Sequence, residues 1–471
     1  MSLPNPDPTR WKALALLCAA QFIVILDTSI IGVALPAIQA DLGFTDDGLS
    51  WIFNAYVIAF GGLLLLGGKL ADVFGARRVF LAGFGLLSAA SLVAGLADSQ
   101  SMLLAGRALQ GVGAALIAPA ALSILMRLFG ARPAELGRAF GFWGASAAAG
   151  GTAGVFLGGV ITEWMSWTWT FLVNVPLGLA VLAIGPAVLR AIPGTRGKIG
   201  LMDSALVTGA IVAAVYAIVT GEQVGWLVPQ TLSLLGGAVG LLALFLTIQA
   251  MSRSPLLPLR LFRAPGVAAG NLVMALLGAA WIPLWFFLNL YLQSALNLSA
   301  FGSGLALLPM TLVIMVFMVK LTGPLIVRFG VKPVMVTGLL AMSGALGLLA
   351  TIPADGTYLA SVLPASLIAA LGMSLAYIPV TMISMGGVAP EGTGLASGLI
   401  NTTYQVGSAL GLAVMVSIAA SQLAGAPHEA VDALSGYRAA FFGAAIVGLL
   451  ASAIALVFVR GNGRVTKVAI G

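Results

Sequence analysis

Long uncharged or nearly uncharged runs, separated by short links with polar and charged residues, follow one another along the whole chain. Most contain about twenty residues, the length of an α-helix that crosses the hydrocarbon core of a bilayer. The charge-free interval 264–319 is too long for one span, and the polar segment Gln293–Ser303 divides it. The pattern predicts fourteen membrane-spanning helices and no soluble domain. The runs lie at 13–36, 49–71, 79–97, 102–126, 139–161, 169–189, 204–221, 231–250, 266–291, 301–319, 333–352, 358–384, 394–420 and 439–459.

Composition excludes a soluble globular protein. Of the 471 residues, 60% are hydrophobic and 8% are charged, whereas soluble domains have about 25% charged residues. The net charge of +7 is spread along the links rather than gathered in a basic patch, so nucleic acid is not an expected partner. A single cysteine, Cys18, excludes an intrachain disulfide and a cysteine-based metal site. With no nucleotide-binding loop, nucleophile–base pair or metal-ligand cluster, we expect neither an enzyme nor a cofactor.

The distribution of Lys and Arg predicts the orientation in the membrane. If the N-terminus is cytoplasmic, the links on the inner side carry twenty of the 22 cations. The outer links carry nine acids and one cation, Arg438. This asymmetry follows the positive-inside rule and supports an even number of helices, with both termini cytoplasmic. The inner cations are Arg10, Lys12, Lys69, Arg77, Arg78, Arg127, Arg132, Arg138, Arg190, Arg196, Lys198, Arg253, Arg260, Arg263, Lys320, Arg328, Lys332, Arg460, Arg464 and Lys467.

One short basic link occurs twice. Gly67–Arg78 reads GGKLADVFGARR, and Gly323–Lys332 reads GPLIVRFGVK. The first copy carries Asp72 where the second has Val327. A link repeated once per half indicates two related six-helix halves, and the distance between the copies leaves room for two inserted helices. We therefore predict an all-α membrane protein with a first half at 1–200, an inserted pair at 201–252 and a second half at 253–471.

Asp27 and Arg107 are charged residues placed well inside predicted spans. A charge at this depth costs at least about 2.5–3.5 kcal/mol, so it marks a candidate functional site. At 1.5 Å per residue, Asp27 lies roughly 13 Å and Arg107 roughly 8 Å from the outer end of its helix. The two can share one layer if their helices adjoin. They then form either a static ion pair that fixes packing or a proton-carrying site, in which water access and the distance to Arg107 control the proton on Asp27.

Three further groups of residues are candidates. Gly150, Gly154 and Gly158, followed by Gly159, form a smooth stripe on one helix, which indicates either close helix packing or a sliding contact between the halves. Lys69, Arg77 and Arg78 are topology anchors in one interpretation, while Asp72 can pair with cations or with the N-terminus of a neighbouring helix. Polar and aromatic residues at mid-span depth are candidate substrate-cavity residues: Asn54, Trp281, Trp285, Phe286, Asn289, Tyr377, Asn401 and Gln405.

Four stretches in combination resemble one family. The segments LDTSIIGVALP (Leu26–Pro36), GRALQGVGAA (Gly106–Ala115), WTWTFLVNVPLG (Trp167–Gly178) and GLASGLINTTYQVGSALG (Gly394–Gly411) are similar to those of the major facilitator superfamily, specifically its fourteen-helix drug/proton antiporters of the EmrB/QacA type. The resemblance implies a facilitator fold, a glycine motif for antiport on Gly150–Gly159, and a latch of Lys69, Asp72, Arg77 and Arg78 that closes the cytoplasmic side. In one departure, Val155 stands where the family motif has proline.

These observations predict a proton-coupled exporter of small amphipathic molecules in the cell membrane, driven by the proton gradient. Asp27 is the one acid well inside a predicted span, so we expect neutral or monocationic lipophilic substrates and poor transport of long dications. The alternative is a negatively charged substrate held by Arg107. Expected partners are the substrate, protons and membrane lipid, with the protein as a monomer. The alternatives are a facilitator or symporter for a metabolite on the same fold, and a transporter of envelope lipid or polymer precursors.

Overall fold

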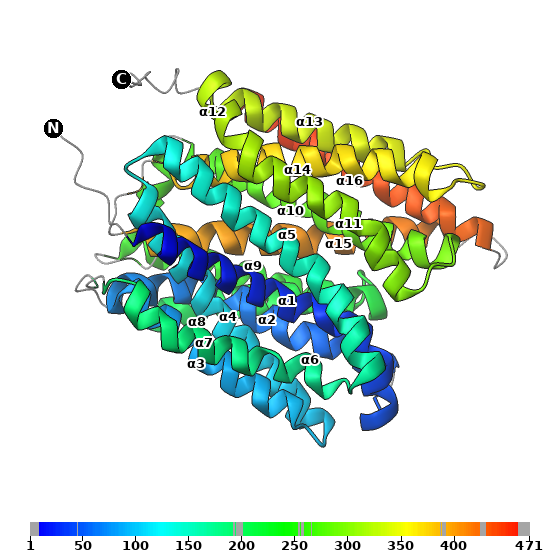
Figure 1. Cartoon of the computed structure of the whole chain (residues 1–471), viewed down its shortest axis with the longest axis horizontal. Helices are drawn as coiled ribbons and strands as arrows, with labels where there is room; N and C mark the ends of the chain where they lie inside the picture. The colour runs from blue at the N-terminus through cyan, green and yellow to red at the C-terminus, as the bar shows by residue number, and fades with distance from the viewer. Residues whose placement is uncertain are drawn as a thin grey trace. The chain divides into compact units, whose positions relative to one another are not determined.

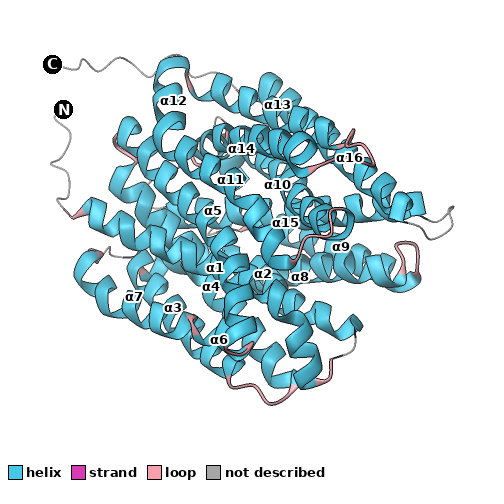
Figure 2. Ribbon diagram, turned by 45° about the vertical axis from the view of Figure 1, so that its right-hand side comes forward, coloured by secondary structure: helices cyan, strands magenta, loops and turns pink. Residues whose placement is uncertain are grey.

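The computed structural model describes residues 9–44, 46–191, 194, 201–252, 255, 259–264, 266–386, 388, 392–423 and 430–459. These residues form helices joined by short loops, with no strand among them (Figure 2). The α-helices are α1 (Arg10–Leu42), α2 (Asp46–Phe74), α3 (Ala76–Gly95), α4 (Gln100–Phe129), α5 (Pro133–Trp164), α6 (Thr168–Leu172), α7 (Asn174–Val188), α8 (Leu201–Val224), α9 (Pro229–Met251), α10 (Val267–Leu290), α11 (Ala300–Phe317), α12 (Gly323–Phe329), α13 (Val331–Leu349), α14 (Leu363–Ser384), α15 (Thr393–Leu423) and α16 (Ala430–Phe458) (Figure 1). Short helical segments of other types are η1 (Leu259–Arg263), η2 (Tyr291–Ala295), η3 (Met318–Thr322) and η4 (Tyr358–Val362).

The predicted spans are present as helices. In the described part of the chain, 13 helical segments are long and apolar enough to cross a membrane. The remaining predicted run, 204–221, coincides with α8, whose apolar stretch Ala205–Ile218 is shorter. The all-α membrane fold is therefore confirmed. Several cations on which the predicted orientation depends lie outside the described residues: Arg196, Lys198, Arg253, Arg460, Arg464 and Lys467.

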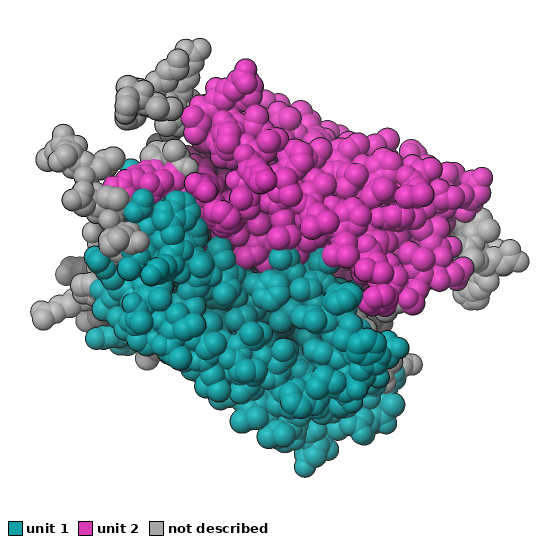
Figure 3. Space-filling model, in the orientation of Figure 1, with its two compact units in different colours: residues 1–131, 149–261, 388–402 teal, residues 132–148, 262–387, 403–471 magenta. Residues whose placement is uncertain are grey.

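The chain forms two compact units (Figure 3). Unit 1 comprises residues 1–131, 149–261 and 388–402, and unit 2 comprises residues 132–148, 262–387 and 403–471. Helices α5 and α15 thus contribute residues to both. The inserted helix α8 belongs to unit 1, where Thr208 and Val212 pack close to Gly62 of α2. The boundaries proposed from the sequence, near residues 200 and 252, remain a prediction.

The repeated link has the same structure in both units. Gly75, between α2 and α3, and Gly330, between α12 and α13, both have φ of 91°, a conformation that glycine adopts readily. Arg77 donates a hydrogen bond to the carbonyl oxygen of Pro186, near the end of α7, at 3.1 Å. At the equivalent position, Lys332 donates to the carbonyl oxygen of Leu456, near the end of α16, at 2.7 Å. In each half, a cation thus binds a carbonyl oxygen near the C-terminal end of the last helix of that half.

Close approaches between helices repeat in the same register. Gly83 of α3 faces Gly113 of α4, and Gly338 of α13 faces Gly372 of α14, with no room for a Cβ atom at any of the four. In the same way Gly178 packs on Ser88, and Gly448 packs on Ser343. These contacts show which residues of the second half correspond to which residues of the first, for each pair of helices.

The predicted glycine stripe packs against α1. A Cβ atom at Gly150, Gly154 or Gly158 would collide with the backbone or side chains of residues 22–30, whereas Gly159 faces open space. Gly407 and Gly411 of α15 pack on Ala275 and Ala279 of α10 in the same way. The packing interpretation of the stripe therefore accounts for its three evenly spaced glycines, and a sliding contact between halves remains a prediction.

Candidate functional site

Helix α4 lies unusually close to two neighbours, and this closeness positions the charged site. Gly106 leaves no room for a Cβ atom against Ala94 of α3, and Gly111 leaves none against the backbone of Tyr56 in α2. Small residues permit such approaches between membrane helices. Arg107 and Gln110 lie between these two glycines, so their side chains reach polar groups on α2 and α3 directly.

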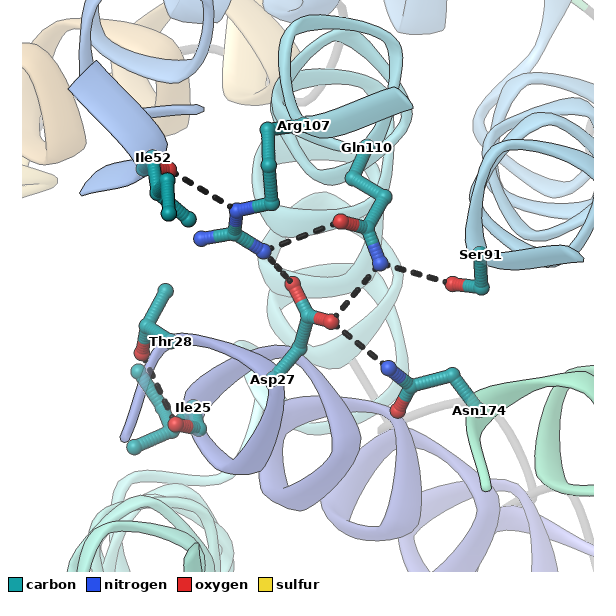
Figure 4. A network of polar contacts seen from close by, with 8 residues as sticks. All are labelled: Ile25, Asp27, Thr28, Ile52, Ser91, Arg107, Gln110 and Asn174. Carbon is teal, nitrogen blue, oxygen red and sulfur yellow. Dashed lines mark hydrogen bonds and ion pairs between the residues drawn. The ribbon is translucent and has the colours of Figure 1, made fainter. Parts of the chain in front are cut away.

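Asp27 and Arg107 meet, as their depths in the sequence predicted. Arg107 Nη1 donates to Asp27 Oδ2 at 3.0 Å, and the two side chains are 0% and 1% exposed (Figure 4). Arg107 Nε donates to the carbonyl oxygen of Ile52 at 3.0 Å, and the guanidinium carbon lies 4.5 Å from the ring centroid of Tyr56. The cation is thus held by a carboxylate, a carbonyl and an aromatic face.

Two carboxamides complete the shell around Asp27 (Figure 4). Gln110 Nε2 and Asn174 Nδ2 both donate to Asp27 Oδ1, at 2.9 and 2.6 Å. Gln110 is fixed on two other sides, because its Oε1 accepts from Arg107 Nη1 at 2.9 Å and its Nε2 also donates to Ser91 Oγ at 2.8 Å. Asp27 therefore accepts hydrogen bonds from three N–H groups on two other helices, an arrangement that suits a carboxylate.

Asn174 owes its position to a break in the predicted sixth span. Pro176 has no N–H to bond the carbonyl of Leu172, which favours the end of α6 at that residue. Asn174 is then the first residue of α7, and it is 0% exposed. Its Oδ1 has no hydrogen-bond partner among the described residues.

The second half has no such network at the equivalent positions. Taking the register from the repeated helix contacts, each of the five side chains in the network has an uncharged counterpart that is also fully or almost fully buried. Ala280 stands for Asp27, Leu346 for Ser91, Ser366 for Arg107, Ala369 for Gln110 and Ala444 for Asn174. The equivalent helices of the second half thus pack together without buried charge at these positions.

Asp72 is a second buried acid, 4% exposed. Its Oδ1 and Oδ2 accept hydrogen bonds from the backbone N–H groups of Gly394 and Leu395, both at 2.9 Å. These are the second and third residues of α15, so the carboxylate binds the positive end of that helix. Gly68 and Gly394 approach without room for a Cβ atom, which lets the carboxylate reach the helix end.

Of the other predicted latch residues, Lys69 lies close enough to Asp72 to interact with its charge, as does Arg127. Arg77 binds the end of α7 rather than Asp72, Arg78 is exposed, and Lys69 is half-buried. Asp72 therefore pairs with a helix N-terminus, one of the two partners that the sequence predicted for it. Arg77 stabilises the neighbouring turn.

The candidate cavity residues are divided between the units. Asn54 and Asn401 belong to unit 1, and the other six belong to unit 2. The rings of Trp281 and Trp285 lie 6.2 Å apart, whereas Phe286 is 41% exposed on another side of α10. Asn289 Oδ1 accepts from Gln293 at 3.1 Å and from Ser303 at 3.0 Å. The ring centroids of Tyr377 and Tyr404 lie 6.3 Å apart. Asn401 donates a hydrogen bond to the carbonyl oxygen of Ser397 at 2.8 Å. Gln405 is half-buried. A shared cavity remains a prediction.

Gln110, Asn174, Ser91 and Tyr56 were missed by sequence reasoning. A signal was present for Gln110, which follows Arg107 by one helical turn and so lies on the same face. Asn174 was marked by its position before a proline inside an apolar run. Among the described residues, no group of three or more His, Cys, Asp or Glu side chains could hold a metal ion.

Comparison with known proteins decides the family. A family profile described as Major Facilitator Superfamily matches residues 17–412. The chain belongs to the major facilitator superfamily. It is 40% identical to the cephamycin export protein CmcT of Amycolatopsis lactamdurans over 447 residues, which cover 93% of this chain and 90% of that one. It is also 37% identical to the puromycin resistance protein pur8 of Streptomyces alboniger, covering 97% and 92% of the two chains.

Solved structures of this superfamily share the fold. The human organic anion transporter MFSD10 (TETRAN) matches with a TM-score of 0.70 at 16% identity, covering 95% of this chain and 100% of that one. The proton:xylose symporter XylE matches with a TM-score of 0.68 at 13% identity, covering 96% of each chain. The protein is thus a multi-span membrane transporter of the major facilitator superfamily and not an enzyme.

Proposed function

We propose that this transporter exports small lipophilic compounds, neutral or monocationic, in exchange for protons. It works by alternating access in the cell membrane, with both termini cytoplasmic and with the proton gradient as its energy source. Relatives named for cephamycin export and for puromycin, tetracenomycin C and lincomycin resistance support a small antibiotic-like substrate.

The observation that carries this proposal is the buried pair Asp27–Arg107 in the first half, set against uncharged residues at the equivalent positions of the second. Replacing a buried ion pair by apolar residues is often neutral or stabilising, so such a pair is not needed for stability. The second half packs equivalent helices with Ala280 and Ser366, both buried. A role as a static packing element therefore explains the pair poorly. A carboxyl group beside a fixed cation is suited to bind and release a proton as its surroundings change.

Asp72 supplies a conformational element for the same cycle. In our proposal, its grip on the start of α15 holds the cytoplasmic side closed in the outward-facing state. Breaking and remaking two hydrogen bonds to one carboxylate gives a two-state contact, which an alternating-access cycle requires.

The test is dye uptake into inverted membrane vesicles with and without a pH gradient. An exporter coupled to protons accumulates dye when the vesicle lumen is acidified, and a protonophore abolishes the accumulation. Asp27→Asn should reduce gradient-driven uptake to the level of empty vesicles while substrate binding remains measurable. An Asn variant that pumps uphill at the normal rate would remove Asp27 from the coupling site.

The alternatives give other outcomes in the same vesicles. A facilitator equilibrates its substrate regardless of the gradient, and a symporter moves it in the same direction as the protons. A transporter of envelope lipid or polymer precursors fails to accumulate dye and instead moves a labelled lipid between leaflets.

A further inference from the structure

The carboxamide of Asn174 differs from that of Gln110 in a way that matters for a proton on Asp27. Both donate to Asp27 Oδ1. Gln110 cannot turn over without losing its bonds to Arg107 and Ser91. For Asn174, by contrast, the donation to Asp27 through Nδ2 is the hydrogen bond observed, and Oδ1 is buried without a partner among the described residues.

A protonated Asp27 requires an acceptor, because a carboxylic acid donates one O–H. In the observed arrangement three N–H donors point at Asp27, so an added proton on Oδ1 would face the Asn174 N–H. A half-turn of the Asn174 amide about its Cβ–Cγ bond exchanges Nδ2 and Oδ1. The carbonyl oxygen then occupies the place from which Nδ2 donated at 2.6 Å, and it accepts the new O–H.

We propose that Asn174 is a reversible hydrogen-bond partner of Asp27, donating to the carboxylate and, after rotation of its amide, accepting from the carboxylic acid. This inference rests on the proposed function, in which Asp27 carries the proton. The step adds one proton to Asp27 Oδ1 and breaks no covalent bond. It leaves Asp27 Oδ1 with a hydrogen bond in both protonation states, so the buried carboxyl group itself does not become unsatisfied there.

Arg107 does not need to move in this step. When Asp27 becomes neutral, the guanidinium keeps the Ile52 carbonyl, Gln110 Oε1 and the ring of Tyr56. In the described contacts, Arg107 on α4 and Tyr56 on α2 are the titratable or charged groups that face Asp27; α3 and α7 present Ser91 and Asn174, which do not titrate. The group that changes its orientation when Asp27 is protonated is therefore the Asn174 amide.

Two substitutions should shift the protonation of Asp27 by different amounts. Asn174→Leu removes one hydrogen bond from the carboxylate and one from the acid, because Asn174 serves both states, so the midpoint should move by less than about threefold in proton concentration. Gln110→Met removes a donor that serves the carboxylate, so protonation should occur at a higher pH, with a midpoint moved by about fivefold to tenfold in proton concentration, the effect of one hydrogen bond.

The measurement is pH-difference infrared spectroscopy of the purified full-length protein in lipid, which needs no substrate and no transport. The Asp27 carboxylic C=O band is identified by its loss in Asp27→Asn. An asparagine amide band should change with the same midpoint in the wild type, and be absent from the difference spectra of Asn174→Leu and Asp27→Asn. A midpoint that moves as far in Asn174→Leu as in Gln110→Met, or an amide band that stays constant, would overturn the role of Asn174. If no Asp27 band titrates in the wild type, the proposed proton coupling itself fails.

Discussion

The two halves of this transporter share a set of equivalent helix contacts and differ in their buried charges. Both have a glycine with φ of 91° before the third helix of the half, a cation on the last helix end and facing glycines such as Gly83 and Gly113. Among the described residues, the buried ion pair and the buried carboxylate that binds a helix N-terminus are both formed by acids of the first half, Asp27 and Asp72; the helix that Asp72 binds, α15, lies in the second half of the sequence.

This difference separates what the fold requires from what it does not. A feature found in both halves, such as the Arg77 and Lys332 contacts, is sufficiently explained by helix ends and turns. A feature found in one half is not needed to pack those helices, because the other half packs them without it. Asp27, Arg107, Asn174 and Asp72 fall in this second class, which directs the functional experiments to the first half.

The largest effect is expected when the first half is given the residues of the second. The fivefold variant Asp27→Ala, Ser91→Leu, Arg107→Ser, Gln110→Ala and Asn174→Ala copies the buried positions of the second half. It should remain folded, since it removes both charges together and leaves neither of them buried and unpaired, and it should lose all gradient-driven dye uptake. The single variant Arg107→Ser is the contrast: it leaves Asp27 buried without its cation, which costs about 3–5 kcal/mol. Elution as a single peak in size-exclusion chromatography and the unfolding temperature measure folding; pumping by the fivefold variant would contradict the comparison.

The next effect concerns Asp72, which the second half replaces by Val327. Asp72→Asn weakens two hydrogen bonds to a carboxylate, each worth about 1.5–3 kcal/mol. The ratio of outward-facing to inward-facing molecules should fall about tenfold or more. Single cysteines placed at each mouth, in a background where Cys18 is replaced, report this ratio through their labelling rates. Arg77→Ala, which removes a contact present in both halves, should shift the ratio far less, and an equal shift would assign the effect to the turn rather than to Asp72.

Much of the fold was predictable because the bilayer fixes the length of a span, and the uncharged runs record it directly. The depths of Asp27 and Arg107 predicted that the two can share one layer, and their meeting depended further on whether their helices adjoin. The rest of the network was not predictable, because neutral polar residues such as Asn174 are common in apolar runs and their partners depend on how each helix is rotated. The register between the halves was hidden for another reason. Links differ in length, so no single shift of the sequence aligns every helix pair.

A smaller effect should distinguish packing from antiport in the glycine stripe. Gly154 of α5 packs closely on α1, and Gly411 of α15 packs on α10 in the equivalent way, whereas Gly159 faces open space. Gly154→Ala and Gly411→Ala should each lower transport about threefold, since overpacking costs about 1–3 kcal/mol, and Gly159→Ala should leave it unchanged. The number of protons exchanged per substrate, measured in proteoliposomes, should stay constant in all three. A change in that number in Gly154→Ala alone would make the stripe specific to antiport.

The smallest effect is expected for bivalent cations, and it follows from the same asymmetry. A cation in a low-dielectric cavity needs a nearby negative charge. The first half offers Asp27, already shared between a proton and Arg107, and the equivalent buried position of the second half is Ala280. One carboxylate can exchange a proton for one positive charge, but it cannot neutralise two charges held far apart. In a pump-deficient host, the protein should therefore raise resistance to a monovalent lipophilic dye, while resistance to a long biguanide or diamidine changes by less than about twofold, close to zero on a free-energy scale. A carboxylate-bearing compound in the same panel tests whether Arg107 admits an anion. Strong resistance to the bivalent compounds that disappears in Asp27→Asn would mean that a second negative group, outside the buried network, takes part in substrate recognition.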